Sequence, residues 1–416
     1  MRKLWVLAVV LVATSLAAQD GAAEFKNGRW WDGNGFRTRT AYVSGNRLTF
    51  HRPHKIGATI DLAGKYVVPP LADAHNHYLD RQSAFADESA AFLHSGTYYL
   101  INPDAIATLA AGIRDLVGRP DTPDALFANG GFTATGGHPQ KLFEQFLWPS
   151  IYKAEGLTKE QLNENAYYLV DSPADFEREW PRFLATKPQV VKVFLLRSDR
   201  YAELKDDTKA FGTKGLDPAL VPIIVDKAHA AGLRVIAHIE NAADFHNALV
   251  AGVDIIGHTP YGLHNAPLEG FRIPDADLEL AARRGTVVTT TMTLGTHEKR
   301  VAELKSLQKD LLQRMLRHHV RIAIGTDSLA GKTLDELQYI HDLGAIPDRG
   351  LLRLAFGTAR IILPDRRVGE LKEGSEASFL VLDADPLQNI AALRSITMRF
   401  KDGRELEVPL EPPAVR

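Results

Sequence analysis

The chain contains no cysteine among its 416 residues. This absence excludes disulfide bonds, thiolate metal sites and a lipid-bearing cysteine, so any metal must be held by nitrogen and oxygen ligands. The formal net charge is only −2, which gives no broad basic field for nucleic acid or an anionic membrane surface. The apolar fraction of 45% is that of an ordinary globular protein. We therefore expect one large domain or two, with a sizeable core and no nucleic-acid partner.

Long apolar runs are also absent, apart from a short one at the amino terminus. Arg2 and Lys3 precede the apolar residues 4–13, which are too few to span a bilayer. Residues 15–17 then fit the small-residue pattern of a signal peptidase site. We expect residues 1–18 to be a cleaved signal peptide, and the mature protein to be periplasmic or secreted without a membrane anchor. An uncleaved anchor is the alternative, which the short apolar run disfavours.

The two ends of the remaining chain are typical of β structure. Residues 23–68 hold short extended runs separated by turns rich in glycine and asparagine. Residues 365–412 hold two more such runs, at 377–382 and 396–400. Neither end shows a helical period. We predict that both ends build one small β-sandwich domain that flanks residues 69–364.

The middle of the chain alternates helix and strand patterns, and part of it repeats. Predicted helices end at Gly232 and at Gly252, and six residues after each glycine a histidine ends an apolar strand, at His238 and at His258. Similar units give eight strands in all. These are residues 67–74, 97–101, 126–130, 190–196, 233–238, 253–258, 286–291 and 319–327.

Regular helix–strand units with apolar strands predict an α/β fold with a parallel sheet covered by helices. Eight such units over about 300 residues match a (β/α)8 TIM barrel, whose chemistry lies at the carboxyl ends of its strands. A doubly wound open sheet is the alternative. It would not bring the ends of the first, fifth, sixth and eighth strands to one point, whereas a closed barrel does.

Polar residues fall at these strand ends. They are His75 and His77 after the first strand, Lys192 in the fourth, His238 in the fifth, His258 in the sixth and Asp327 in the eighth. Because side chains alternate along a strand, the two histidines of the first strand face the same way. Each residue has an ordinary explanation by itself, such as a buried ion pair for Lys192 or a helix cap for Asp327. Their joint placement predicts a site for zinc or a similar divalent metal.

With these residues in view, the chain resembles the amidohydrolase superfamily. The run His75-Asn76-His77 is similar to the first-strand His-x-His motif of that superfamily. His238 and His258 are similar to its histidines on strands five and six, and Asp327 to its eighth-strand aspartate. Residues 356–383 resemble the passage back into its flanking β-sandwich. The resemblance covers nearly everything after the predicted signal peptide.

Lys192 indicates a branch within the superfamily. Residues 190–194, Val-Val-Lys-Val-Phe, are similar to a motif of imidazolonepropionase-like and Xaa-Pro dipeptidase-like members, in which the lysine is carboxylated and bridges two metals. Residues 133–139 also resemble a loop of that branch whose histidine, here His138, faces the substrate. The chain departs from the family in having Pro69-Pro70 for the usual Pro-Gly and residues 195–198 for a glycine-rich run. The second departure touches the substrate pocket and puts the substrate's identity in question.

The resemblance implies a metal-dependent hydrolase with two divalent metals, for which we expect two Zn2+ ions. His75, His77 and Asp327 would hold one metal and His238 and His258 the other, with Lys192 bridging them as its carbamate. A metal-bridging hydroxide would cleave a C–N bond of an amide, cyclic amide or dipeptide, and Asp327 would be the catalytic residue that transfers the proton. The substrate would be a small molecule or dipeptide-like, contacted by His138, Arg197 and Tyr98.

Three other functions stay open on the sequence alone. A lactonase or esterase uses the same attack on a different bond. A mononuclear deaminase would need only one metal, with Lys192 in a structural role. A non-catalytic binding protein would have no need for six metal ligands, and the sequence disfavours it. A homo-oligomer is neither required nor excluded.

Overall fold

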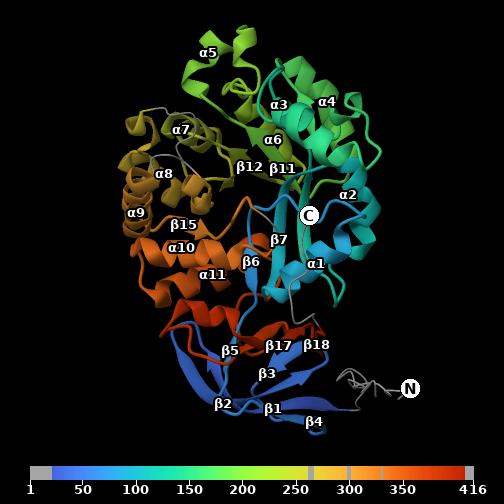
Figure 1. Ribbon diagram of the computed structural model, residues 1–416, viewed down its shortest axis with the longest axis vertical. Coiled ribbons are helices and arrows are strands. Elements are labelled where there is room, and N and C mark those ends of the chain that lie inside the picture. The colour runs from blue at the N-terminus through green and yellow to red at the C-terminus, as the bar shows by residue number, and fades with distance from the viewer. Residues whose placement is uncertain (1–20, 261–266, 298–300, 329–330, 408–416) are drawn as a thin grey trace, which may run out of the picture.

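The computed structural model describes residues 21–260, 267–297, 301–328 and 331–407. The predicted signal peptide therefore lies outside the described residues. None of the helices in these ranges combines the length and apolarity that a bilayer span requires. In Figure 1 a sheet formed by both chain ends lies at the bottom, and helices surround a set of parallel strands above it.

The lower sheet has eight strands, which pair in the order β18-β17-β16-β5-β1-β2-β3, with β4 beside β1. Their bounds are β1 Ala22–Trp31, β2 Phe36–Ser44, β3 Arg47–Thr49, β4 Ile56–Asp61, β5 Tyr66–Val68, β16 Phe379–Leu382, β17 Ile396–Lys401 and β18 Arg404–Glu405. The antiparallel pairing of β5 with β16 joins the two ends of the chain.

This sheet curls on itself around an aromatic core. β1 and β17 are separated by two strands in the pairing order, so in a flat sheet they would lie about 14 Å apart. The rings of Phe25 in β1 and Phe400 in β17 nevertheless have centroids only 5.1 Å apart. Phe379 lies 5.2 Å from Phe25 on the same core. Burial of these rings therefore holds the two chain ends together.

The upper strands form two parallel sheets, in the orders β10-β9-β11-β12-β13-β14-β15 and β6-β7-β8. Their bounds are β6 Leu71–Asp73, β7 Thr97–Ala105, β8 Asp124–Asn129, β9 Gly131–Thr133, β10 Tyr167–Leu169, β11 Val190–Phe194, β12 Arg234–His238, β13 Ile255–Ile256, β14 Val287–Thr289 and β15 Arg321–Ala323. Parallel strands alternating with helices make this part of the molecule an α/β fold, as the sequence predicted at this level.

The two parallel sheets meet on both sides. Gly130, with a positive φ of 81°, is the single residue between β8 and β9. On the other side, the amide of Ala74 after β6 donates to the carbonyl of Ile324 after β15 at 2.8 Å. The ends of β6 and β15, far apart in sequence, are thereby neighbours.

The prediction of a single first strand over residues 67–74 is wrong. β5 belongs to the lower sheet and β6 to the parallel strands, with Pro69 and Pro70 between them. Proline has no amide hydrogen to donate to a sheet, so the two residues interrupt the pairing. The chain passes from one part of the molecule to the other at this point.

Helices follow most of the parallel strands and cover them on the outside (Figure 1). Their bounds are α1 Phe85–His94, α2 Ala107–Ile113, α3 Gln140–Leu142, α4 Pro173–Ala185, α5 Tyr201–Leu204, α6 Val221–Ala230, α7 Ala242–Ala251, α8 Asp275–Arg284, α9 Val301–Arg317, α10 Thr333–Leu343 and α11 Asp348–Ile362. Asn241 and Asp244 form a capping box at the start of α7, and Gly252, with φ of 89°, ends it.

Candidate metal centre

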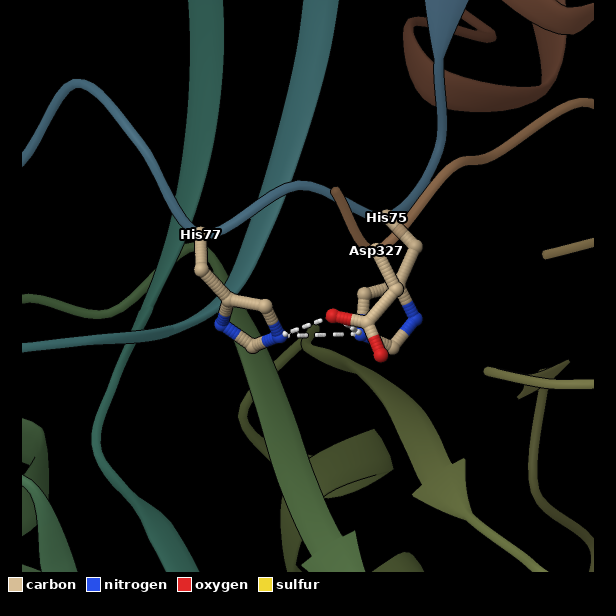
Figure 2. Close-up of side chains that lie close together, drawn as sticks. All are labelled: His75, His77 and Asp327. Carbon is tan, nitrogen blue, oxygen red and sulfur yellow. Dashed lines mark hydrogen bonds and ion pairs between the residues drawn. The ribbon is translucent and has the colours of Figure 1, made fainter. Parts of the chain in front are cut away.

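The predicted ligand residues lie at or near the carboxyl ends of five parallel strands. His75 and His77 follow β6, Lys192 lies in β11, His238 ends β12, His258 follows β13 and Asp327 follows β15. Figure 2 shows the side chains of His75, His77 and Asp327 pointing toward one another from two separate stretches of chain.

These three side chains form what we call the first ligand group. His77 Nε2 lies 2.9 Å from Asp327 Oδ1 and 3.2 Å from His75 Nε2. His75 Nε2 is 3.7 Å from the same carboxylate oxygen. One ligand atom from each residue thus lies within 4.8 Å of the others. The three ligand atoms converge on a single point.

A backbone carbonyl selects which nitrogen of His75 faces this point. His75 Nδ1 lies 2.8 Å from the carbonyl oxygen of Gly257, to which it donates, so the lone pair is on Nε2. Gly257 permits this approach because a Cβ there would lie 3.3 Å from His75 Nδ1. The ring is therefore oriented for ligation by a contact from a different strand.

His238 and His258 form the second ligand pair. His238 Nδ1 lies 3.0 Å from His258 Nε2, and both rings are buried. Burial and the nearby Lys192 charge lower the pKa of His238 to about 3. Burial and the neighbouring imidazoles likewise hold the pKa of His258 well below its usual value. Both rings are therefore neutral near pH 7, which is the form that binds a metal.

Lys192 is 1% exposed, and its Nζ lies 5.2 Å from the centre of the Phe194 ring. Burial lowers the pKa of Lys192 to about 8, against the opposing attraction of Asp104 and Asp327. Within the described ranges this amine makes no hydrogen bond or ion pair with another side chain. Gly131 leaves room for it, since a Cβ there would lie 2.9 Å from Lys192 Cγ.

Asp327 and His77 stabilise each other's charged forms. Burial alone would raise the pKa of Asp327, but His75 and His77 outweigh it and hold that pKa far below its usual value. Burial would lower the pKa of His77, but Asp327 outweighs it and raises that pKa. Asp327 is therefore ionised at all ordinary pH values and available as a ligand or base.

The donor atoms suit a divalent metal. They are imidazole nitrogens and a carboxylate oxygen, which are the ligand types that zinc takes without cysteine. Tetrahedral zinc with Zn–N bonds of about 2.0–2.1 Å places neighbouring ligand atoms about 3.3 Å apart. The separations within the first group, 2.9–3.7 Å, and within the second pair, 3.0 Å, lie around this value. His238 Nε2, which faces away from His258, is buried without a hydrogen-bond partner among the described residues, and Glu240 lies 3.8 Å from it.

The structure places the three predicted pocket residues at different distances from the centre. The His138 ring stacks on His238 with centroids 4.4 Å apart, so His138 reaches the centre. Arg197 lies just beyond β11, with its guanidinium 3.4 Å from the Thr213 carbonyl. Tyr98 lies at the start of β7 and is fully buried. Burial raises the pKa of its hydroxyl, and the charge of Arg399 in β17 opposes this rise. The start of a parallel strand is the opposite end from the ligands, so the structure does not bring Tyr98 to the site.

Two buried carboxylates near the centre escaped the sequence analysis. Asp104 is 5% exposed, and burial raises its pKa to about 7 against the attraction of His77 and Lys192. Asp80 is 1% exposed, and burial raises its pKa to about 6. The predicted second strand ended at residue 101, before a proline, whereas β7 runs on to Ala105. Because the predicted strand ended too early, Asp104 was not recognised as a residue near a strand end. An aspartate in that position can be identified from the sequence.

A cavity of about 690 Å3 is lined in part by residues 134–136, which precede His138 in the same loop. It lies between the loop at residues 134–136, the segment at residues 201–211 and Asp171, Lys214 and Asp217. None of the six ligand residues belongs to its described lining. The amide of His138 donates to the Lys214 carbonyl at 2.7 Å, so the wall of this cavity also supports the loop that carries His138.

Comparison with known proteins gives the following matches. Residues 199–406 match the model of the amidohydrolase family. Ochratoxinase of Aspergillus niger is 24% identical over 225 residues, which cover 49% of this chain. The match spans 44% of that curated relative, which is less than half of its length.

Solved structures share the fold over nearly the whole chain. An amidohydrolase superposes with a TM-score of 0.73 at 19% identity, covering 94% of this chain and 100% of the other. A Xaa-Pro dipeptidase with bound methionine has a TM-score of 0.71 at 18% identity, covering 93% and 100%. Aspergillus niger ochratoxinase has a TM-score of 0.71 at 18% identity, covering 95% and 98%.

Proposed function

The chain belongs to the amidohydrolase family, and on that premise we propose that it is a metal-dependent hydrolase that cleaves a C–N bond in a small-molecule or dipeptide-like substrate. The observation that carries the proposal is the convergence of imidazole and carboxylate donors in the first ligand group and the second ligand pair. The Xaa-Pro dipeptidase and the ochratoxinase share the fold, and their names support an amide or peptide substrate.

The proposal includes the finer architecture. The parallel strands form a closed (β/α)8 barrel over residues 69–364, supported by the bond between Ala74 and Ile324 that links the first and last strands. The curled sheet of residues 23–68 and 365–412 is a β-sandwich, supported by the ring contacts across it. Export through the signal peptide at residues 1–18 is a further part of the proposal and rests on the sequence of those residues.

We assign two divalent metals, with Zn2+ as the expected ion. The first ligand group would hold one metal and the second ligand pair the other. Carboxylated Lys192 would be an anionic oxygen ligand to both metals. Its lowered pKa supports this assignment, because the neutral amine is the form that combines with carbon dioxide. A bound divalent metal polarises a carbonyl group and lowers the pKa of water toward about 7.

Protein groups supply the remaining chemistry. Asp327, ionised and held 2.9 Å from His77, accepts a proton from the attacking water and returns it to the leaving nitrogen. His138 is neutral, because burial and His238 hold its pKa well below the usual value. It therefore offers one donor and one acceptor to a substrate carbonyl or carboxylate. Burial of the His75, His238 and His258 rings keeps bulk water from that side of the centre and strengthens these electrostatic interactions.

Metal content and turnover test the proposal together. We expect the purified wild-type protein to hold two metals per chain and to hydrolyse members of a panel of amides and dipeptides. Lys192→Met should reduce the metal content toward one per chain and the activity by at least about 100-fold, the upper range for residues that only support ligands. Lys401→Met is the matched control, because Lys401 is fully buried but lies in β17, where it contacts Asp124 and the Arg119 carbonyl. It should lower stability and leave the metal content unchanged.

Each alternative predicts a different result. One tightly bound metal in the wild-type protein would favour a mononuclear deaminase. Turnover of lactones and esters without amides would favour an esterase. A metal-loaded protein that turns over none of these substrates would contradict an enzymatic role. Two tightly bound metals in an active Lys192→Met protein would contradict the bridging assignment.

A further inference from the structure

Asp73 is a fully buried carboxylate at the end of β6, two residues before His75. We propose that Asp73 is a positioning residue that sets the distance between Asp327 and the two histidines of the first ligand group, and thereby the metal affinity of that group. The inference rests on the proposed metal-dependent function. It assigns to Asp73 a role that the ligand pattern does not require.

Each oxygen of this carboxylate joins the two loops that carry the ligands. Oδ1 accepts from the backbone amide of His75 at 3.1 Å and from that of Thr326 at 3.0 Å. Oδ2 accepts from the Asn76 side-chain amide at 3.3 Å and from the Thr326 hydroxyl at 2.7 Å. One partner of each oxygen belongs to His75 or to the adjoining Asn76, and the other belongs to Thr326, which directly precedes Asp327. The carboxylate therefore spans the gap between the loops twice.

The surrounding bonds transmit this constraint to the ligands themselves. The amide of Asp327 donates to the His75 carbonyl at 2.8 Å, and Asp327 has a left-handed φ of 49°. The Asn76 side chain also donates to the Ser328 carbonyl at 3.1 Å. A left-handed conformation is unfavourable for a residue with a Cβ, so it persists only where neighbouring bonds hold it. Asp73 and the His75 carbonyl supply such bonds before and at Asp327, and the Asn76 side chain supplies one after it.

A carboxylate is required here because all four partners are donors. The two carboxylate oxygens offer about four lone-pair positions, which these partners fill. Asparagine has the same shape, but its NH2 group would face two donors from opposite loops. The two loops would then move apart on one side. This movement would change the spacing of the ligands without leaving a cavity in the core. Asp73→Asn therefore separates positioning from packing.

Glu336 provides a matched control. It is also fully buried, and it accepts from the amides of Met292 and Thr293 at 2.8 and 2.9 Å and from the Thr293 hydroxyl at 2.7 Å. It thus ties the segment after β14 to α10, and its hydrogen bonds in the described part of the chain go to neither the His75 loop nor the Asp327 loop. Glu336→Gln disturbs an equally buried carboxylate without touching the first ligand group.

The experiment measures Zn2+ affinity by competition with a chelating dye, together with the unfolding temperature of each metal-free protein. Asp73→Asn should weaken one Zn2+ site by about 10- to 100-fold and leave the other site unchanged. Thr326→Val removes the 2.7 Å hydroxyl contact with Asp73, together with the longer bonds that the hydroxyl accepts from Asn76 and Ser328. It keeps the other three bonds to Asp73 and should weaken the same site less. Glu336→Gln should lower the unfolding temperature and bind Zn2+ as the wild type does.

The outcomes are distinguishable. If the wild type binds Zn2+ and Asp73→Asn binds it with the same affinity, Asp73 has no positioning role. The same conclusion follows if Glu336→Gln loses as much affinity as Asp73→Asn, because the effect would then be a general loss of order. If Asp73→Asn does not fold, a wild-type affinity in Thr326→Val overturns the inference. Failure of the wild type itself to bind Zn2+ would instead overturn the proposed metal centre, and this inference with it.

Discussion

The two parts of the candidate centre are built differently. The first ligand group is held by bonds to the protein: Gly257 orients His75, and the His75 carbonyl and Asp73 fix the loop before Asp327. In the second ligand pair, His258 Nδ1 lies 3.4 Å from the Thr291 hydroxyl. His238 is the last residue of β12, and its Nε2 is buried without a hydrogen-bond partner in the described part of the chain. The fold therefore preorganises the first group, whereas the positions of the second pair depend more on a bound metal.

Their electrostatic surroundings differ as well. Asp73, Asp80 and Asp104 surround the first group as buried carboxylates, each with a pKa raised by burial, to about 7, 6 and 7 respectively. The second pair consists of imidazoles whose pKa values are lowered. The comparison teaches that one half of the centre lies among buried carboxylates and is fixed by hydrogen bonds from the fold, whereas the other half is neutral and depends more on what it binds.

Removal of one ligand from each half should produce the largest effects. We expect both His75→Ala and His258→Ala to lose more than about 100-fold in activity, since ligand loss exceeds the effect of losing a supporting residue. His258→Ala should retain one tight metal, because the first group is held without it. His75→Ala should retain only weakly bound metal. Metal analysis after dialysis against a chelator decides between these outcomes, and equal retention by the two variants would contradict the comparison.

Gly325→Ala should disturb the first group by steric contact. A Cβ at this position would lie 2.3 Å from Thr289 Cγ2 and 3.0 Å from the His75 amide nitrogen. We expect a loss of about 2 kcal/mol in the free energy of unfolding, within the range for overpacked cores, together with weaker metal binding. Urea unfolding measures the first and chelator competition the second.

Gly357→Ala is the control for this variant. Gly357 lies in α11, and the nearest atom to a Cβ there is Arg360 Nη2 at 3.9 Å. Alanine should be neutral or stabilising at this exposed-side helical position. A similar destabilisation by both substitutions would show that the contact with His75 is not the cause.

Asp80→Asn should have the smallest effect and one that depends on pH. The pKa of Asp80 in the folded protein, about 6, is above its ordinary value of 3.8. The folded state therefore holds the proton more tightly, and the contribution of Asp80 to stability falls as the pH rises from about 4 to about 6. Asparagine does not titrate, so the variant does not lose this contribution. Its free energy of unfolding should therefore rise by about 1.4 kcal/mol relative to that of wild type between pH 5 and pH 8.

The measurement is urea unfolding of the metal-free proteins at these two pH values. Titrating groups remote from Asp80 are common to both proteins and cancel in the difference, whereas Asp104 loses the contribution that the Asp80 charge makes to its raised pKa. Asp121→Asn, at an exposed position, is the control and should show no such trend. A constant difference between wild type and Asp80→Asn across the range would show that the carboxylates beside the first group do not carry the burial cost inferred for them.

Parts of the fold and of the site could be predicted because they depend on local pattern. The ends of α6 and α7 follow from Gly232 and Gly252, both of which have a positive φ, and the helix–strand alternation predicts parallel strands. The division of residues 67–74 between two sheets was missed. Pro69 and Pro70 mark the interruption in the sequence, but an apolar run does not show which sheet each half joins. Tyr98 was misplaced for a related reason: a strand pattern does not show which of its residues reach the mouth.

The sequence by itself determined the chemistry available to this protein. Without cysteine and with histidines at strand ends, only nitrogen and oxygen ligands for a divalent metal could be assembled. Tertiary structure alone decided how those ligands are held. Asp73 and Thr326 are 253 positions apart and meet through hydrogen bonds of 2.7 and 3.0 Å. Such contacts depend on ångström-scale distances between strands that are distant in the chain, and residue spacing along the chain carries no information about them.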